Sequence, residues 1–96
     1  MKLEANLAAL NAALTFTPGE GPFNLALGGT FVATVVAEKS LDAGATWLPV
    51  MADAYGTAAS YTAPGVLLAE EAEAGATWRL RVSAYTSGTV AARASR

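Results

Sequence analysis

Carboxylates are the side chains in this sequence that could most readily do chemistry, because it contains no histidine and no cysteine. Their absence removes the usual acid–base group near neutral pH, thiolate nucleophiles and the commonest zinc ligands. Acidic residues could instead supply oxygen ligands for calcium or the carboxylate pair of a glycosidase, and the candidates are Asp42, Asp53, Glu70, Glu71 and Glu73. No Asp-x-Asp-x-Asp-Gly spacing is present and no pair stands out, so we expect solvated acidic loops, no enzyme activity, no metal site and no cofactor.

Glu38 differs from these acids because it ends an apolar, β-branched run at residues 30–38. A carboxylate among apolar neighbours needs a partner if it is buried. Arg79 or Arg81 would be that partner if their strand lies beside the strand of Glu38. An outward-facing Glu38 without such a pair is an equally good interpretation of the sequence.

The large aromatic residues could form binding surfaces. Trp47 and Trp78 could together make a flat platform for a sugar, but core packing is favoured, because a small alanine-rich domain needs its few large aromatic side chains inside. The three tyrosines are expected at the surface, where tyrosine is enriched in protein contacts. We therefore predict Tyr55, Tyr61 and Tyr85 as interface residues.

One six-residue pattern occurs twice, as Asp-Ala-Gly-Ala-Thr-Trp at residues 42–47 and as Glu-Ala-Gly-Ala-Thr-Trp at residues 73–78. In each copy the acid can accept hydrogen bonds from nearby backbone, the glycine can supply a positive φ, and Thr-Trp begins a β-prone run. Both copies therefore predict turns that lead into strands. The predicted turn residues are Asp42, Gly44, Trp47, Glu73, Gly75 and Trp78.

Length and charge limit the classes of protein that the sequence can encode. With 96 residues there is room for one domain and one core, and little room for an enclosed active site. The formal net charge is −2 and the basic residues are scattered, which argues against binding nucleic acid through its phosphates. No stretch approaches the roughly 20 apolar residues of a membrane-spanning helix, and the N-terminus makes a poor signal peptide. We expect neither nucleic acid nor membrane as a partner.

Residues 1–22 are predicted to form an N-terminal arm and a linker, ahead of a domain at residues 23–96. Large apolar side chains follow the i, i+4, i+7 spacing of a helix face at Leu3, Leu7, Leu10 and Leu14. This spacing predicts a helix, although an alanine-rich arm can also be drawn into a sheet, and a short strand is expected near residues 13–17. Two prolines and two glycines within residues 18–22 predict a loop.

The rest of the sequence consists of short runs that are typical of β-strands. Residues 23–27 and 30–38 are expected to pair across a Gly-Gly turn, and residues 46–50 should return as an edge strand or a bulge because Pro49 lacks a ladder donor.

The C-terminal part adds a strongly alternating strand at residues 78–85 and a last strand at residues 89–94. In total, about seven short strands separated by glycine and proline predict an all-β fold. Their number and spacing indicate an immunoglobulin-like β-sandwich.

Two parts of the sequence, residues 23–50 and residues 73–96, resemble a family of small virion proteins from tailed bacteriophages and phage-like particles. The similar motifs are the Glu-Lys-Ser step at residues 38–40, the Gly-Ala-Thr-Trp hairpin at residues 44–47 and the Ser-Gly-Thr turn at residues 87–89. The N-terminal 22 residues fall outside this resemblance.

The resemblance implies a β-sandwich that is made in the host cytoplasm and lies on the exterior of the virion. There it would bind the major capsid protein or another virion protein, as a capsid decoration protein or as the base of a head fibre or spike. In such modules the terminal arm often contacts the capsid or neighbouring subunits, so Leu3, Leu7, Leu10 and Leu14 are predicted interface residues. An apolar arm that a small core cannot bury also predicts a homo-oligomer, with a trimer favoured.

Two other functional classes stay open at this point. The first is a carbohydrate-binding or adhesion module on the same sandwich, and the second is a tail or connector component of the particle.

Overall fold

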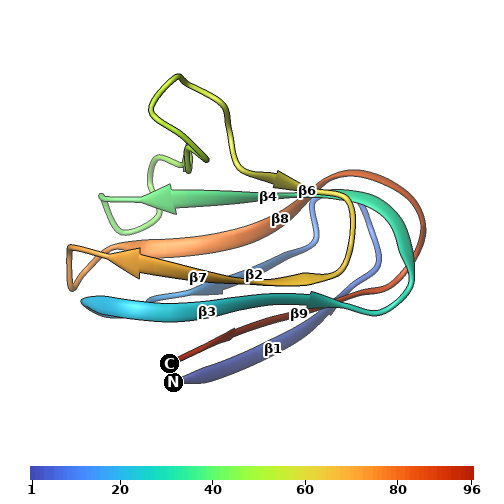
Figure 1. Cartoon of the computed structure of the whole chain (residues 1–96), viewed down its shortest axis with the longest axis horizontal. Helices are drawn as coiled ribbons and strands as arrows, with labels where there is room; N and C mark the ends of the chain where they lie inside the picture. The colour runs from blue at the N-terminus through green and yellow to red at the C-terminus, as the bar shows by residue number, and fades with distance from the viewer.

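The computed structural model describes residues 1–96 as nine β-strands in two antiparallel sheets, with no helix (Figure 1). The strands are β1 (Lys2–Leu7), β2 (Ala13–Phe16), β3 (Gly21–Gly28), β4 (Phe31–Ser40), β5 (Leu48–Pro49), β6 (Ser60–Tyr61), β7 (Gly65–Glu71), β8 (Thr77–Gly88) and β9 (Val90–Ser95). The first sheet has the order β1-β9-β3-β7 and the second the order β2-β8-β4-β5, with β6 also paired to β4. The predicted all-β fold is confirmed, with nine strands in place of about seven.

The predicted N-terminal helix is wrong, because residues 2–7 form β1 and pair with β9 from Lys2↔Ser95 to Leu7↔Val90. The short strand expected near residues 13–17 is confirmed as β2, which pairs with β8. β1 and β2 form hydrogen bonds with backbone groups of β9 and β8 that would otherwise lack partners at the edges of the two sheets. An isolated helix of the same length would be only marginally stable. Contacts with neighbouring strands therefore override the helical spacing of the leucines.

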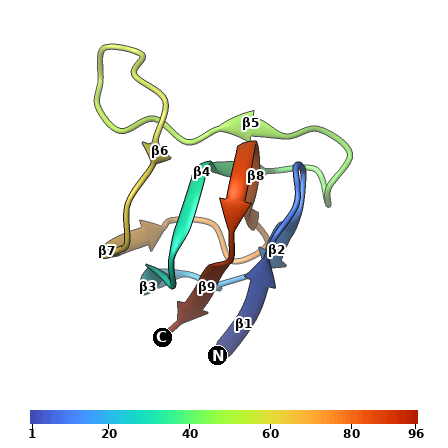
Figure 2. The same cartoon turned by 90° about the vertical axis from the view of Figure 1, so that its right-hand side faces the viewer.

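Tight crossings carry the chain from one sheet to the other. The segment between β1 and β2 crosses in this way, with Asn11 at a φ of 66°. The expected pairing of residues 23–27 with residues 30–38 is wrong for the same reason, because β3 lies in the first sheet and β4 in the second (Figure 2). Gly29 at this crossing has a φ of 85°, and an added Cβ would come within 2.5 Å of the Thr89 carbonyl oxygen of the β8–β9 crossing.

The core fills the space between the two sheets. Alternate residues of β3, β8 and β9 face inward, as their burial patterns show. Phe23 is 1% exposed and makes edge-to-face contacts with Phe16 at 5.9 Å and with Trp78 at 5.0 Å between ring centroids. Because many of the other buried residues are alanine and valine, these three rings supply a large share of the apolar area removed from water.

Candidate interaction surfaces

Glu71 at the end of β7 is a buried carboxylate that joins the two sheets. Its Oε1 accepts hydrogen bonds from Trp78 Nε1 at 2.7 Å and from Lys39 Nζ at 2.7 Å, and its Oε2 accepts one from the Glu73 N–H at 2.9 Å. Burial by itself raises the pKa of Glu71, but these contacts outweigh burial and hold the pKa below its usual value. The expectation of a solvated acidic loop is therefore wrong for Glu71, whose side chain is 0% exposed.

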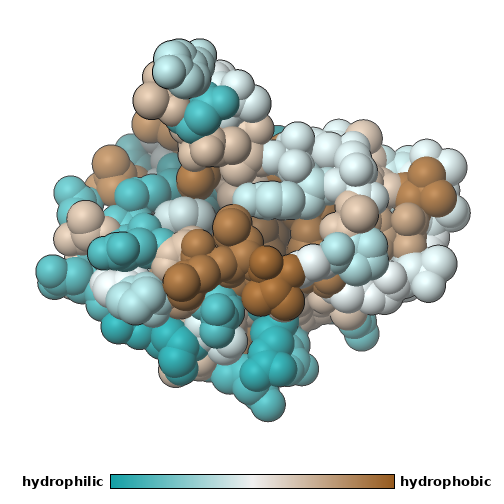
Figure 3. Space-filling model, in the orientation of Figure 1, coloured by the Kyte–Doolittle hydropathy of each residue, from teal (hydrophilic) through white to brown (hydrophobic).

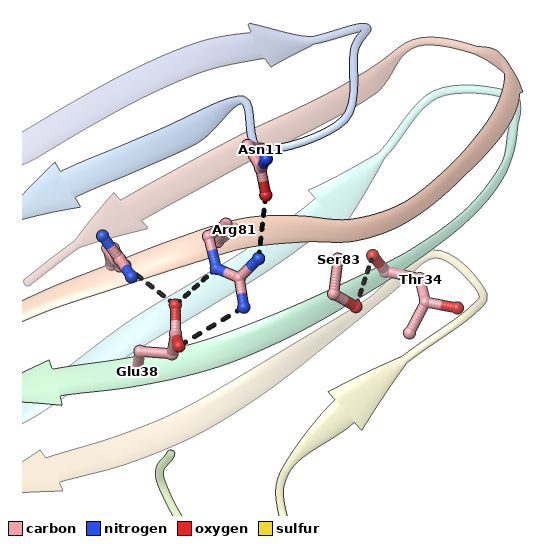
Figure 4. A network of polar contacts seen from close by, with 6 residues as sticks. Asn11, Thr34, Glu38, Arg81 and Ser83 are labelled. Carbon is pink, nitrogen blue, oxygen red and sulfur yellow. Dashed lines mark hydrogen bonds and ion pairs between the residues drawn. The ribbon is translucent and has the colours of Figure 1, made fainter. Parts of the chain in front are cut away.

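Glu38 on β4 lies opposite Arg79 on β8 and binds two arginines, which is one of the two interpretations left open by the sequence (Figure 4). Its Oε1 accepts hydrogen bonds from Arg79 Nε at 2.8 Å and from Arg81 Nε at 2.7 Å. Arg81 also donates to Asn11 Oδ1 at 3.0 Å, which ties the β1–β2 crossing to this cluster. The pKa of Glu38 is lowered, mainly because of the hydrogen bond from Arg81, which outweighs the raising effect of burial. This cluster is internally paired and leaves no free nucleophile or acid.

The two copies of the repeated turn pattern differ in structure. In the first copy Asp42 Oδ1 accepts the Thr46 N–H at 2.8 Å and the Ser40 hydroxyl at 2.7 Å, and Gly44 has a φ of 92°, as predicted. In the second copy the Glu73 carboxylate accepts no hydrogen bond, and Gly75 does not have a positive φ. There the buried Glu71, two residues earlier, binds the turn backbone instead.

The two tryptophans have separate environments. Trp78 is 5% exposed and packs in the core, which confirms the favoured interpretation for this residue. Trp47 lies outside the strands and is half-buried, with the Arg79 guanidinium 4.3 Å from its ring centroid. The pair therefore does not form a shared flat platform.

The predicted interface residues divide into core and surface positions. Leu7 and Leu14 are buried in the core, whereas Leu3 and Leu10 are exposed. The two half-buried tyrosines, Tyr61 and Tyr85, pack against the core, and the Tyr85 hydroxyl donates to the Gly88 carbonyl at 2.8 Å. Tyr55 is 94% exposed and is the most accessible of the large apolar and aromatic side chains.

Tyr55 lies on a loop of residues 50–59 that projects from the sandwich (Figure 1). The loop is closed by an isolated bridge between Met51 and Ala58 and by the buried Ala59 at its base. Within the loop, Asp53 Oδ1 accepts the Tyr55 N–H at 2.8 Å and the Thr57 N–H at 3.3 Å. The hydrogen bond from Tyr55 is the main cause of a lowered pKa of Asp53, so this carboxylate shapes the loop.

Exposed apolar side chains gather at the base of the projecting loop. Leu41, Leu48 and Met51 are exposed and line a hollow of about 360 Å³ that reaches Lys39 and Trp78. Together with Tyr55 they form what we name the loop surface. Of these four residues only Tyr55 was predicted from the sequence, because the other three are not adjacent in sequence.

A second apolar surface follows the outer edge of the first sheet. Val66, Leu67 and Leu68 on β7 are exposed, and Figure 3 shows hydrophobic side chains gathered over the centre of this face, where Figure 1 places β7. We name these three residues the edge surface. These three residues were not predicted from the sequence, although three consecutive large apolar residues without alternation are an unusual feature of a strand that is open to solvent.

No group of three or more residues that could hold a metal ion is present, and no helix could cross a membrane. Comparison of the chain with models of protein families, with curated proteins and with solved structures found no match.

Proposed function

We propose that this protein is a non-enzymatic structural component of a tailed phage particle, with an immunoglobulin-like arrangement of its two sheets. In this proposal it lies on the exterior of the virion and binds the outer capsid surface as a decoration or cement protein or as the base of a head spike. Support comes from the resemblance of residues 23–50 and 73–96 to small virion proteins. Further support is that Glu38 and Glu71, the most buried acidic groups, are engaged in structural contacts.

The observation that carries the proposal is the loop surface. A loop held by its own hydrogen bonds presents the exposed Tyr55, and the exposed Leu41, Leu48 and Met51 line a hollow at the base of this loop. An ordered loop loses little conformational entropy when it binds, and tyrosine is among the residues that dominate interface energies. This arrangement suits docking onto a protein surface with apolar depressions.

This surface replaces the N-terminal arm as the main contact. The arm was expected to bind the capsid because a small core could not bury it, but Leu7 and Leu14 are part of the core. Leu3 and Leu10 stay predicted interface residues at the margin of the sandwich. Attachment through the loop surface would depend on apolar contact, so it should survive moderate salt.

Binding of purified protein to empty capsids tests the proposal. We expect Tyr55→Ala to weaken co-sedimentation by at least about tenfold, because an interface anchor contributes roughly 2 kcal/mol or more. Asp53→Asn should weaken it less, by loosening the loop without removing the anchor. Val32→Thr is the matched control, because Val32 is an exposed apolar residue of β4 outside every predicted interface, and this variant should bind like the parent protein. Equal binding by the parent and by Tyr55→Ala would reject the loop surface as the contact.

The carbohydrate-binding alternative has lost its main support, since Trp78 is buried against Phe23 and only Trp47 remains near the surface. A purified protein that bound a defined glycan and ignored capsids would nevertheless reject the proposed class. A tail or connector component would use the same fold, and the number of copies per particle distinguishes it from a capsid-bound protein.

A further inference from the structure

The edge surface lies on the one long, unprotected strand edge of the molecule. The other outer strands have features that discourage pairing with another chain: β1 carries Lys2 and Glu4, β2 has four residues, β5 has two and includes Pro49, and β6 has two. By contrast, β7 has seven residues with neither lysine nor proline, and its first five residues, Gly65–Ala69, carry no charge. A long apolar edge of this kind is a ready template for a further strand.

The sandwich is also open beside this edge. Val66 and Leu68 point to the outer face of the first sheet and are 76% and 70% exposed. Leu67 faces the other way, toward a hollow of about 220 Å³ between the sheets that Leu25 and Leu80 also line. A strand added to β7 would therefore cover apolar groups on both of its faces, and its inward side chains would close the hollow.

We propose that β7 pairs antiparallel with β7 of a second copy of this chain, about a two-fold axis at Leu67. In this register Leu67 lies opposite Leu67 of the second copy, and Val66 lies opposite Leu68 of the second copy. Directly opposite residues lie on the same face of a sheet. Each Leu67 would therefore lie at the mouth of the hollow between the sheets, and Val66 would contact Leu68 of the second copy on the outer face. The first sheet of one copy and the first sheet of the other would join into one continuous sheet.

The charges of β7 favour this arrangement. Glu70 lies three residues beyond Leu67, so antiparallel pairing separates the two Glu70 side chains by about 20 Å along the sheet. Parallel pairing would instead place them on adjacent strands about 4.8 Å apart, where like charges repel. The two-fold contact is also closed, so it produces a dimer and not a fibre. This dimer takes the place of the predicted trimer, because the reason for the trimer was an unburied arm and Leu7 and Leu14 are buried.

The size of the contact sets the expected affinity. Seven strand residues extend about 23 Å, whereas stable interfaces bury about 1,200–2,000 Å² in total. A strand pair with three apolar side chains from each copy falls at the small end of this range. We therefore expect a dissociation constant of about 10–100 µM.

Cysteine cross-linking tests the register, because the natural chain has no cysteine. Residues directly opposite in an antiparallel pair have Cα atoms about 4.5–5.5 Å apart, which a disulfide can span. Leu67→Cys should therefore form a covalent dimer under mild oxidation. Leu68→Cys is the matched control, because its two copies would be offset by two residues and about 8 Å apart, beyond disulfide reach. Cross-linking of Leu68→Cys at the rate of Leu67→Cys would overturn the register.

Sedimentation of the purified protein tests the association itself and needs no capsid, so its outcome is independent of the proposed function. We expect a reversible monomer–dimer equilibrium between about 1 µM and about 1 mM. Leu68→Lys, an outward and exposed change that should not unfold the protein, should weaken dimerisation by at least about tenfold. Leu48→Lys, on the loop surface, should leave it unchanged. A monomer at every concentration, or a dimer that Leu48→Lys disrupts and Leu68→Lys does not, would overturn the proposal.

Discussion

Glu71 and Trp78 are joined by a hydrogen bond of 2.7 Å from the indole Nε1 to the carboxylate Oε1, inside the protein and between its two sheets. Glu71 ends a strand of the first sheet, and Trp78 lies near the start of a strand of the second. The same carboxylate binds Lys39, whose ammonium also lies 5.8 Å from the centroid of the Trp78 ring. The edge of the sandwich next to the second copy of the turn pattern is therefore stabilised by these polar contacts as well as by apolar packing.

Replacing Glu71 should destabilise the protein more than replacing the residue beside it. Glu71→Gln removes the charge that pairs with Lys39, and we expect a loss of about 2–3 kcal/mol in the free energy of unfolding, since Lys39 stays partly accessible to water. Glu70→Gln is the matched control, because Glu70 is exposed, and its effect should stay within about 0.5 kcal/mol. Urea denaturation measures both. Equal effects of the two substitutions would contradict the role assigned to Glu71.

Stability should fall in acid, and Glu71 should account for part of the fall. The pKa values of Glu38 and Glu71 are lower in the folded protein than the ordinary value of a glutamate, so the unfolded chain takes up protons first as the pH drops. The stabilisation is complete well above pH 4.5 and is lost progressively as the pH falls through the lowered folded pKa values. In Glu71→Gln the free energy of unfolding should fall less steeply as the pH drops, whereas Glu70→Gln should show the same fall as the parent protein. Denaturation curves from neutral pH to about pH 3 measure the effect, and an unchanged slope in Glu71→Gln would be inconsistent with it.

The two copies of the turn pattern should respond differently to the same substitution. Asp42→Ala removes the acceptor of the Thr46 N–H and of the Ser40 hydroxyl, so it should measurably lower the thermal stability of the protein. Glu73→Ala removes a carboxylate that accepts no hydrogen bond, so its effect should be close to zero. Thermal unfolding of the two variants makes the comparison. A larger loss for Glu73→Ala would show that the difference between the turns is misassigned.

Deleting residues 1–16 should unfold the protein and not merely release a surface arm. The deletion removes β1 and β2 together with three buried side chains, those of Leu7, Leu14 and Phe16. Each such side chain contributes about 2–5 kcal/mol, and the sum is comparable with the whole stability of a small domain, about 5–15 kcal/mol. We expect no cooperative thermal transition for the truncated chain. A folded, monomeric fragment of residues 17–96 would contradict the assignment of these strands to the core.

Much of the local structure could be predicted, because it depends on residues close in sequence or on simple alternation. The turn at Asp42 and Gly44, the edge position of Pro49 and the alternating strand β8 all follow from local rules. The pairing of Glu38 with Arg79 and Arg81 needed only the assumption that two strong strands are neighbours.

The sheet to which each strand belongs could not be predicted in this way. Gly28-Gly29 suits a hairpin as well as a crossing between sheets, and only the packing of the whole core decides between them. The burial of Glu71 was missed for a related reason, since its inward position depends on the register of β7 against β3 and on the presence of Lys39 from the other sheet. The leucines of the arm follow a helical spacing, but the edges of β8 and β9 determine their structure.

The number of copies of this protein in purified particles tests the central claim most directly. If it decorates the capsid, quantitative mass spectrometry should find it in a fixed ratio to the major capsid protein. It should also stay on tailless heads after washing above about 0.15 M salt, where exposed ionic contacts are largely screened. Absence from particles, or a copy number that follows the tail components, would contradict the account.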